Sequence, residues 1–211
     1  MVNERKIPVI GILGGVASGK SFVAGEFARQ GAVVLDADRA GHEVLRQPDV
    51  EQAIRGRFGD KVFDGDGHVV RSELAKLVFA TTPQGRDDLE YLERLTHPRI
   101  GACLQGEIAE IERSGTAKVI VLDAPVLLKA GWNRYCDKIV FVEAPREARI
   151  ERALSRGWTR EEFVRREAAQ ESLDAKRKLA DAVLDNSGPP ESVRAEVERM
   201  WRQFVDPSPP K

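Results

Sequence analysis

A glycine-rich segment near the N-terminus has the residue types and the spacing of a phosphate-binding loop. Gly14 is followed by four residues and then by Gly19, Lys20 and Ser21, which satisfies the pattern G-x-x-x-x-G-K-[ST]. Glycines let the backbone curl so that successive N–H groups point inward at a phosphate, and the N-terminus of the following helix adds positive charge. In this pattern the lysine reaches the β- and γ-phosphates, and the serine hydroxyl can bind Mg²⁺. The alternative, an ordinary strand-to-helix turn, does not require this spacing.

Three aspartates follow apolar runs that are expected to be buried strands. Asp36 and Asp38 come after one run, and Asp123 follows four aliphatic residues of another. In an α/β sheet, ligands bind beyond the carboxyl ends of the strands, so these carboxylates are expected near the loop. One of them could accept a proton from an attacking hydroxyl or help to hold Mg²⁺. Two alternatives stay open: Asp38 could cap a helix over Arg39–Leu45, and Asp123 could be a turn residue.

The segment 146–178 is rich in arginine and lysine, and most of these cations are expected to be solvated. Glutamates at helical spacing can pair with them. A guanidinium at a helix end beside the loop could instead close over a triphosphate, because its fork matches phosphate oxygens. Arg152 and Arg156 are the candidates for that position.

Two other patterns are rejected as metal sites. Asp64 and Asp66 are each followed by glycine, but the remaining oxygen ligands and the closing glutamate of a calcium loop are missing, so a turn is predicted. The three histidines, His42, His68 and His97, are too scattered along the chain to propose a metal centre.

Five short apolar runs must position these groups. They are continuous rather than alternating in polarity, which is typical of strands buried on both faces of a parallel sheet. Segments with helical spacing separate them, so the predicted class is α/β, a five-stranded parallel sheet covered by helices. The runs are Val9–Leu13, Ala32–Leu35, Val119–Leu122, Lys138–Val142 and Ala182–Leu184.

A long insertion separates the second and third predicted strands. It contains four segments with helical spacing and one predicted hairpin over Val62–Val70. An insertion of this size in a compact α/β domain is usually functional, for example a substrate lobe. The helical segments are Val50–Phe58, Ser72–Phe79, Thr82–Leu95 and Pro98–Glu112.

Length and composition exclude several classes of protein. The chain has 211 residues, 33 Lys plus Arg against 34 Asp plus Glu, and a formal net charge of −1, which disfavours a general nucleic-acid binder. Cys103 and Cys136 form no C-x-x-C pair, so a reducing cytoplasm fits best. The apolar N-terminal run is broken by Pro8 and glycines, and no segment reaches the roughly 18 apolar residues of a membrane span. A loose tail is expected over Pro207–Lys211.

Taken in order, these motifs closely resemble those of the dephospho-CoA kinase family. The phosphate loop alone specifies only a nucleotide-binding superfamily, whereas the ordered set is far more specific. The resemblance spans about residues 7–205. Besides the loop, it rests on Asp36-Ala-Asp38-Arg-Ala-Gly-His42, on Leu92-Glu-Arg-Leu-Thr-His97-Pro98, and on Ala180-Asp181 followed by Asn186-Ser-Gly188.

The resemblance implies an enzyme that uses ATP and Mg²⁺ to phosphorylate the ribose 3′-hydroxyl of dephospho-CoA, the last step of coenzyme A synthesis. It implies that Asp38 is the catalytic base, that Lys20 and Arg156 act on the phosphates, and that Ser21 holds Mg²⁺ with Asp38 or Asp123 as further candidates. The implied nucleotide-binding residues are Gly14, Gly15, Val16, Ala17, Ser18, Gly19, Lys20, Ser21 and Phe22. The implied acceptor-binding residues are Asp36, Asp38, His42, Arg71 and His97.

The same resemblance implies how a single P-loop kinase-type domain over 1–211 is organised. The nucleotide-binding core is expected over residues 7–38, 117–145 and 180–205, the helical acceptor lobe over 39–116, and the lid over 146–179. Nucleic acid, membrane and an obligate protein partner are not expected.

Three residues depart from the family pattern. Phe22 and Leu13 stand where the family usually has threonine, and Lys129 stands where it has glutamate, which reverses a charge near the expected acceptor pocket. Two other functions therefore stay open. One is another P-loop kinase, for shikimate, gluconate or a nucleoside monophosphate. The other is a nucleotide-binding regulator that has lost catalysis.

Overall fold

A five-stranded parallel sheet forms the centre of the computed structural model, which describes residues 7–205. The strand order is β2-β3-β1-β4-β5, and every neighbouring pair is parallel. The predicted sheet is thus confirmed, with strand ends that differ by one residue from the apolar runs. The strands are β1 (Val9–Gly14), β2 (Val33–Asp36), β3 (Ile120–Asp123), β4 (Lys138–Glu143) and β5 (Ala182–Asp185). The predicted tail at 207–211 lies outside the described residues.

The strand order places the phosphate loop at the middle of the sheet. β1 is buried along its whole length and pairs with β3 on one side and β4 on the other. The chain leaves β1 for β2 on the β3 side of the sheet, and it later crosses from β3 to β4 on the other side of β1. A ligand crevice opens beyond the strands at such a switch point. The register pairs Asp36 at the end of β2 with Asp123 at the end of β3. Both carboxylates therefore follow neighbouring strands at the same edge of the sheet.

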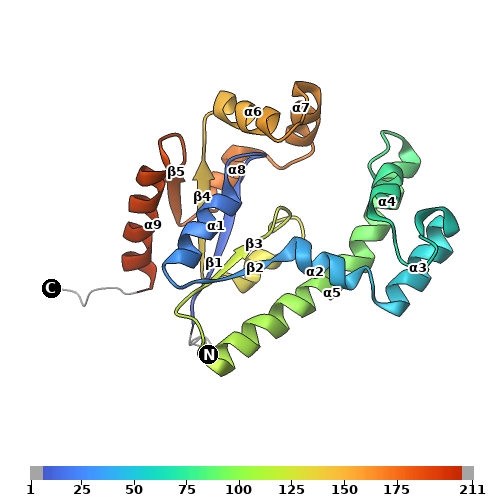
Figure 1. Cartoon of the computed structure of the whole chain (residues 1–211), viewed down its shortest axis with the longest axis horizontal. Coiled ribbons are helices and arrows are strands. Elements are labelled where there is room, and N and C mark those ends of the chain that lie inside the picture. The colour runs from blue at the N-terminus through green and yellow to red at the C-terminus, as the bar shows by residue number, and fades with distance from the viewer. Residues whose placement is uncertain (1–6, 206–211) are drawn as a thin grey trace. The chain divides into compact units, whose positions relative to one another are not determined.

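Two helices cover one face of the sheet. α1 (Lys20–Arg29) and α9 (Pro190–Phe204) pack against each other and bury an apolar cluster with the strands (Figure 1). The helical residues of this cluster include Val23, Phe27, Val193, Val197 and Trp201, all under 9% exposed. Gly31, with φ 105°, ends the turn after α1 and leads into β2.

Three helices follow β4 and make up the segment that the sequence predicts to be a lid. They are α6 (Arg146–Ser155), α7 (Arg160–Ala168) and α8 (Leu173–Lys178). The arrow of β4 points towards α6 in Figure 1. Gly157, with φ 82°, follows the C-cap of α6, and the Thr159 hydroxyl caps α7 by accepting the Glu162 N–H at 3.1 Å.

The chain divides into two compact units. Within the described range, one consists of residues 7–36 together with 108–205, and the other is Ala37–Glu107. The second unit contains the insertion. Its elements are α2 (Ala37–Val44), α3 (Pro48–Phe58), the 3₁₀ helix η1 (Asp60–Val62), α4 (Arg71–Val78) and most of α5 (Pro83–Ser114). The first unit also has a 3₁₀ helix, η2 (Trp132–Tyr135).

The predicted hairpin in the second unit is a single antiparallel bridge between Phe63 and Val69. The Asp64 carboxylate accepts the N–H groups of Asp66 at 3.1 Å and His68 at 2.9 Å. The His68 N–H bond above all, with the one from Asp66, lowers the pKa of Asp64, although partial desolvation acts in the opposite direction. The carboxylate of Asp64 therefore serves the turn, as the sequence predicts.

Two expectations about helices are wrong. The segments Thr82–Leu95 and Pro98–Glu112 are one continuous helix, α5, with Pro98 inside it. Pro98 has no N–H to donate to the Arg94 carbonyl one turn earlier, and the Arg99 guanidinium donates to the neighbouring Leu95 carbonyl at 2.8 Å. α2 begins at Ala37, so Asp38 lies in its first turn and is not the N-cap.

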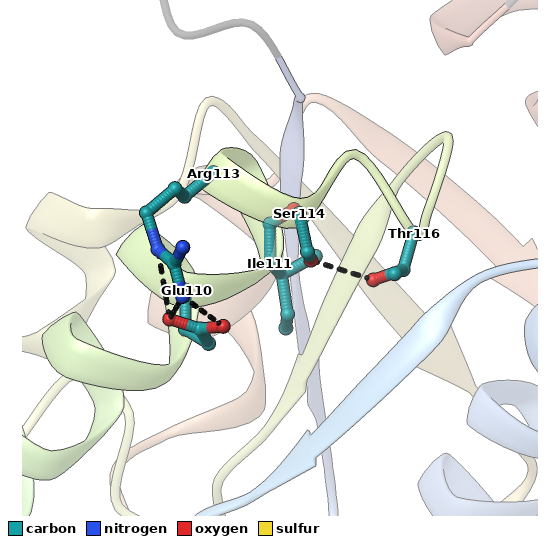
Figure 2. Close-up of polar contacts among 5 residues, drawn as sticks. All are labelled: Glu110, Ile111, Arg113, Ser114 and Thr116. Atoms are coloured by element: carbon teal, nitrogen blue, oxygen red, sulfur yellow. Dashed lines mark hydrogen bonds and ion pairs between the residues drawn. The ribbon is translucent and has the colours of Figure 1, made fainter.

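The end of α5 leads into β3 through a tight set of local bonds (Figure 2). The Ser114 hydroxyl donates to the Ile111 carbonyl at 3.2 Å and bonds the Thr116 hydroxyl at 3.1 Å. Arg113 and Glu110 form an ion pair at 2.6 Å one turn before the end.

Among the described residues, no helix is both long enough and apolar enough to cross a membrane.

Candidate active site

The phosphate loop connects β1 to α1, as its sequence predicts. Gly19 is the N-cap of α1 and has φ 94°, a conformation that L-residues with a side chain rarely adopt. The Lys20 ammonium donates to the Gly15 carbonyl at 3.3 Å, so the side chain folds back over the loop. Ser18 is fully buried and its hydroxyl has no hydrogen-bond partner among the described residues. The loop backbone, the helix N-terminus and the lysine together have the positive polarity that binding of an anion requires.

Ser21 and Asp123 bring two oxygen ligands together beside this loop. The Ser21 hydroxyl donates to Asp123 Oδ2 at 2.9 Å. Mg²⁺ prefers oxygen ligands and is usually held by one or two protein groups together with phosphates and water. The pair fits that requirement, although the described residues contain no cluster of three or more His, Cys, Asp or Glu side chains that could hold a metal.

Arg152 joins the phosphate loop to the loop after β5. Its Nη1 donates to the Ser18 carbonyl at 3.0 Å, and its Nη2 donates to the Asn186 carbonyl at 2.6 Å. The Asn186 side chain donates to the same Ser18 carbonyl at 2.7 Å. Of the two arginines that the sequence offers as candidates, Arg152 therefore contacts the loop. Arg156 is exposed and forms the C-cap of α6.

Two residues at the loop receive no site role from the sequence, although Asn186 belongs to one of the motifs that carry the family resemblance. Asn186 follows β5 directly, so the rule that placed Asp36 and Asp123 at strand ends would have indicated it. Arg149 donates to the Val16 carbonyl at 3.4 Å and is only 3% exposed. Nothing in the sequence distinguishes Arg149 from the many solvated arginines of the same segment.

A cavity of about 150 Å³ opens beside Gly15. It lies between the end of β4 and α8, and its charged lining includes two arginines and two acids. Arg177 pairs with Glu143 at 3.4 Å across this lining. The charged lining residues are Glu143, Arg149, Asp174 and Arg177.

The expected acceptor-binding residues lie at the end of β2 and on three helices of the second unit. Asp38 and His42 are both exposed and lie four residues apart on α2, so they share one face of that helix. Arg71 is the first residue of α4 and is exposed, whereas His97 is half-buried in α5 just before Pro98. Asp36 is exposed at the end of β2.

The three departures from the expected pattern have different environments. Leu13 is 3% exposed in β1 and belongs to the core. Phe22 is 38% exposed in the first turn of α1, and Lys129 is exposed after β3.

Comparisons with known proteins agree with one another. The family model described as dephospho-CoA kinase matches residues 8–191. The dephospho-CoA kinase of Carboxydothermus hydrogenoformans is 37% identical over 94% of this chain and 95% of its own length. That of Geobacter metallireducens is 37% identical over 95% of this chain and 98% of its own length.

Solved structures show the same fold. A crystal structure from Thermus thermophilus has a TM-score of 0.79 and 33% identity, and the match covers 94% of this chain and 99% of that one. The shikimate kinase of Acinetobacter baumannii, at 11% identity, has a TM-score of 0.52 over 98% of this chain and 97% of its own, a likeness of fold alone.

Proposed function

The chain belongs to the dephospho-CoA kinase family, and from that premise we propose which of its residues carry out the reaction. The enzyme transfers a phosphoryl group from ATP to the 3′-hydroxyl of dephospho-CoA, the final step of coenzyme A biosynthesis. It is therefore a kinase whose substrates are ATP and dephospho-CoA. The observation that carries our assignment of residues is the phosphate loop with Lys20 and the Ser21–Asp123 pair at its end.

The phosphate loop binds the triphosphate of ATP in this proposal. Backbone N–H groups from Gly14 to Ser21 surround the phosphates, and Phe22 continues the site into α1. Lys20 leaves the Gly15 carbonyl and binds the β- and γ-phosphates, where its charge offsets the charge that develops on the transferred group. The contacts of Arg152 to Ser18 and Asn186 support a lid that meets the loop, and Arg156 is the proposed lid residue near the phosphates.

Ser21 and Asp123 hold Mg²⁺, with Asp38 as the other candidate ligand. Their 2.9 Å contact supports this assignment, because both oxygens already face each other beside the loop. When bound, the ion neutralises charge on the β- and γ-phosphate oxygens.

Asp38 accepts the proton of the ribose 3′-hydroxyl. Its exposed carboxylate lies two residues beyond the strand end that carries Asp36. Phosphoryl transfer depends mainly on positioning and charge neutralisation, so the carboxylate first orients the hydroxyl in line with the γ-phosphate and takes its proton late. Asp36, His42, Arg71 and His97 bind the acceptor.

The proposed organisation and location follow from the same assignment. The core comprises residues 7–38, 117–145 and 180–205, the acceptor lobe 39–116 and the lid 146–179. We place the enzyme in the cytoplasm, since both cysteines are thiols in the described part of the chain. It acts without nucleic acid, membrane or an obligate protein partner.

Lys20→Ala tests the assignment of the loop. Lys20 is half-buried at a helix start, so the free energy of unfolding should change by less than about 1 kcal/mol. Turnover, measured by coupled ADP release, should fall by at least about 10²-fold, because a charge that stabilises the transition state is lost. Lys118→Ala, which removes an exposed lysine before β3, is the control and should keep full activity. Equal turnover in the two variants would exclude the assignment.

The choice of acceptor is tested in the same assay. Dephospho-CoA, shikimate, gluconate and nucleoside monophosphates are compared at equal concentration with the wild-type enzyme. ADP release should depend on dephospho-CoA. Comparable turnover with another acceptor would instead favour a broader kinase activity.

A further inference from the structure

We infer that Arg149 and Glu167 form a positioning pair, which ties the lid helices to the middle of the phosphate loop and so sets the affinity for ATP. The inference rests on the proposed role of the loop and adds two residues to it. Neither residue needs to touch the nucleotide, because both act through the loop backbone at Val16.

Arg149 connects the loop to α7 through a buried guanidinium. One nitrogen, Nη2, lies 2.8 Å from Glu167 Oε1, and the other, Nη1, donates to the Val16 carbonyl at 3.4 Å. The Arg149 side chain is only 4% exposed, whereas Glu167 is 26% exposed. Glu167 also pairs with Arg146, at 2.9 Å. A contact made on α7 is thus carried by one side chain to the backbone of the loop.

The part of the loop that Arg149 contacts is also the part that needs support. Ala17 has φ 56°, and no other non-glycine residue in the range 7–205 has a positive φ. Such a conformation is costly for a residue with a Cβ and persists only when its surroundings hold it. Val16 and Ala17 pack in a buried apolar cluster with Ile150, Ala153 and Phe163 from α6 and α7. The lid helices therefore hold the loop by apolar contact as well as through Arg149.

Gly15 shows how closely the arginine approaches the loop. A Cβ placed on Gly15 would lie 2.9 Å from Arg149 Nη1, which is too close for a carbon atom and a guanidinium nitrogen. Absence of a side chain at position 15 therefore lets the guanidinium pass beside the backbone that must surround the phosphates.

The arginine is poorly satisfied for a residue that serves stability alone. Its Nε is buried and has no hydrogen-bond partner among the described residues. Buried ion pairs contribute little to stability relative to apolar groups of similar size, and their best-attested role is to specify one arrangement. The arrangement specified here is that of Val16 and Ala17 relative to α6 and α7.

The test measures nucleotide affinity rather than activity alone. Arg149→Gln, Glu167→Gln and the double variant are titrated with ADP by calorimetry, and KM is determined separately for ATP and dephospho-CoA. Arg149→Gln should raise the Kd for ADP and the KM for ATP by at least about fivefold, while the KM for dephospho-CoA changes by less than about twofold. The double variant should bind ADP with the same Kd as Arg149→Gln alone, because the two residues act as one pair. Arg149→Lys should recover part of the affinity.

Arg146→Gln is the matched control. It removes the other guanidinium that pairs with the Glu167 carboxylate. The Arg146 side chain is 49% exposed and, among the described residues, makes no hydrogen bond to the phosphate loop. Its affinity for ADP should equal that of the wild type. Wild-type affinity in Arg149→Gln, or an equal loss in Arg146→Gln, would overturn the inference. If Arg149→Gln fails to fold, Glu167→Gln and Arg149→Lys replace it in the test. Wild-type affinity for ADP in both of these variants would also overturn the inference.

The failure of the proposed function would look different. In that case Lys20→Ala would keep its turnover and its affinity for ADP whatever the result at Arg149. Lost affinity in Lys20→Ala together with unchanged affinity in Arg149→Gln would leave the proposed function intact and reject only the positioning pair.

Discussion

Asp36 and Asp38 are close in sequence but belong to different structural settings. Asp36 ends a strand and is in register with Asp123, whereas Asp38 lies in the first turn of α2, one turn before His42. An acid in a first helical turn is favoured by the helix dipole, so Asp38 has a structural role as well as the proposed chemical one. A substitution that removes the charge and keeps the size can separate the two.

Asp38→Asn is therefore expected to lower kcat by at least about 10²-fold, because a positioned general base contributes roughly 10²–10⁴-fold to rate. The melting temperature should barely move, since asparagine keeps the shape and the loss of one favourable dipole interaction costs at most about 1 kcal/mol. Asp36→Asn is the matched control and should lose much less activity. Initial rates at saturating ATP and dephospho-CoA measure both variants.

The opposite pattern would identify Asp38 as a structural residue. Reduced stability with unchanged turnover in Asp38→Asn would mean that its charge serves α2 alone. Asp123 would then be the next candidate for the base.

Residues of the loop could be predicted from sequence, whereas Arg149 could not. Gly14 to Ser21 have a fixed spacing that only one local structure uses, so the chemistry is readable without knowing the fold. Arg149 is one of many arginines at helical spacing in 146–178. Its role depends on burial and on a contact with Val16, which is 133 residues away in sequence. Contacts over such a separation are set by the sheet and helix packing, and local sequence carries no signal for them.

At the scale of elements, α7 begins at a side-chain cap that its sequence provides. Thr159 lies two residues after Gly157, and its hydroxyl accepts the Glu162 N–H. The helix that follows contributes Phe163 to the apolar cluster on the phosphate loop. This cap thus helps to hold a helix that packs on the candidate active site.

Thr159→Ala should lower the free energy of unfolding by about 1 kcal/mol, because a helix N–H loses its side-chain acceptor. Thr159→Ser keeps a hydroxyl at the same place and should retain most of the stability. Urea titration followed by circular dichroism compares the two. Equal midpoints for Thr159→Ala and the wild type would show that the bond contributes nothing to stability.

The sequence predicts separate helical segments on either side of Pro98, but the structure has one continuous helix there. Proline usually ends a helix because it lacks an N–H and its ring meets the preceding turn. α5 nevertheless continues to Ser114, and Arg99 both donates to the Leu95 carbonyl and pairs with Asp49 at 2.7 Å. The Arg99–Asp49 pair is a tertiary contact between residues 50 apart in sequence, and the proline alone gives no indication of it.

At the scale of the whole molecule, the existence of the strands was predictable and their order was not. Continuous apolar runs identify strands buried on both faces, because a strand with one face in water alternates between apolar and polar residues. The order β2-β3-β1-β4-β5 depends on which strands pair. β2 and β3 are neighbours although the entire unit Ala37–Glu107 separates them along the chain. Apolar runs contain no information about such partners.

Asp181 bonds two neighbouring strands of the sheet, and its carboxyl makes the free energy of unfolding depend on pH. Its carboxylate accepts the Ile139 N–H at 2.8 Å and the Lys138 ammonium at 3.1 Å, which joins the start of β5 to β4. Burial favours the neutral carboxyl, but these two bonds outweigh it and lower the pKa of Asp181 below its ordinary value of 3.8.

A carboxyl with a lowered pKa stabilises the folded state fully above the unfolded value and loses that effect as pH falls through the folded value. The free energy of unfolding should therefore lie above that of Asp181→Asn at neutral pH, and the difference should shrink once pH falls below 3.8. Asparagine can still accept the Ile139 N–H, so the comparison isolates the charge. Urea midpoints for both proteins, measured from neutral pH down to the acid transition, give the difference directly. If the difference in the free energy of unfolding stayed constant over this pH range, the charge of the Asp181 carboxylate would contribute nothing to stability.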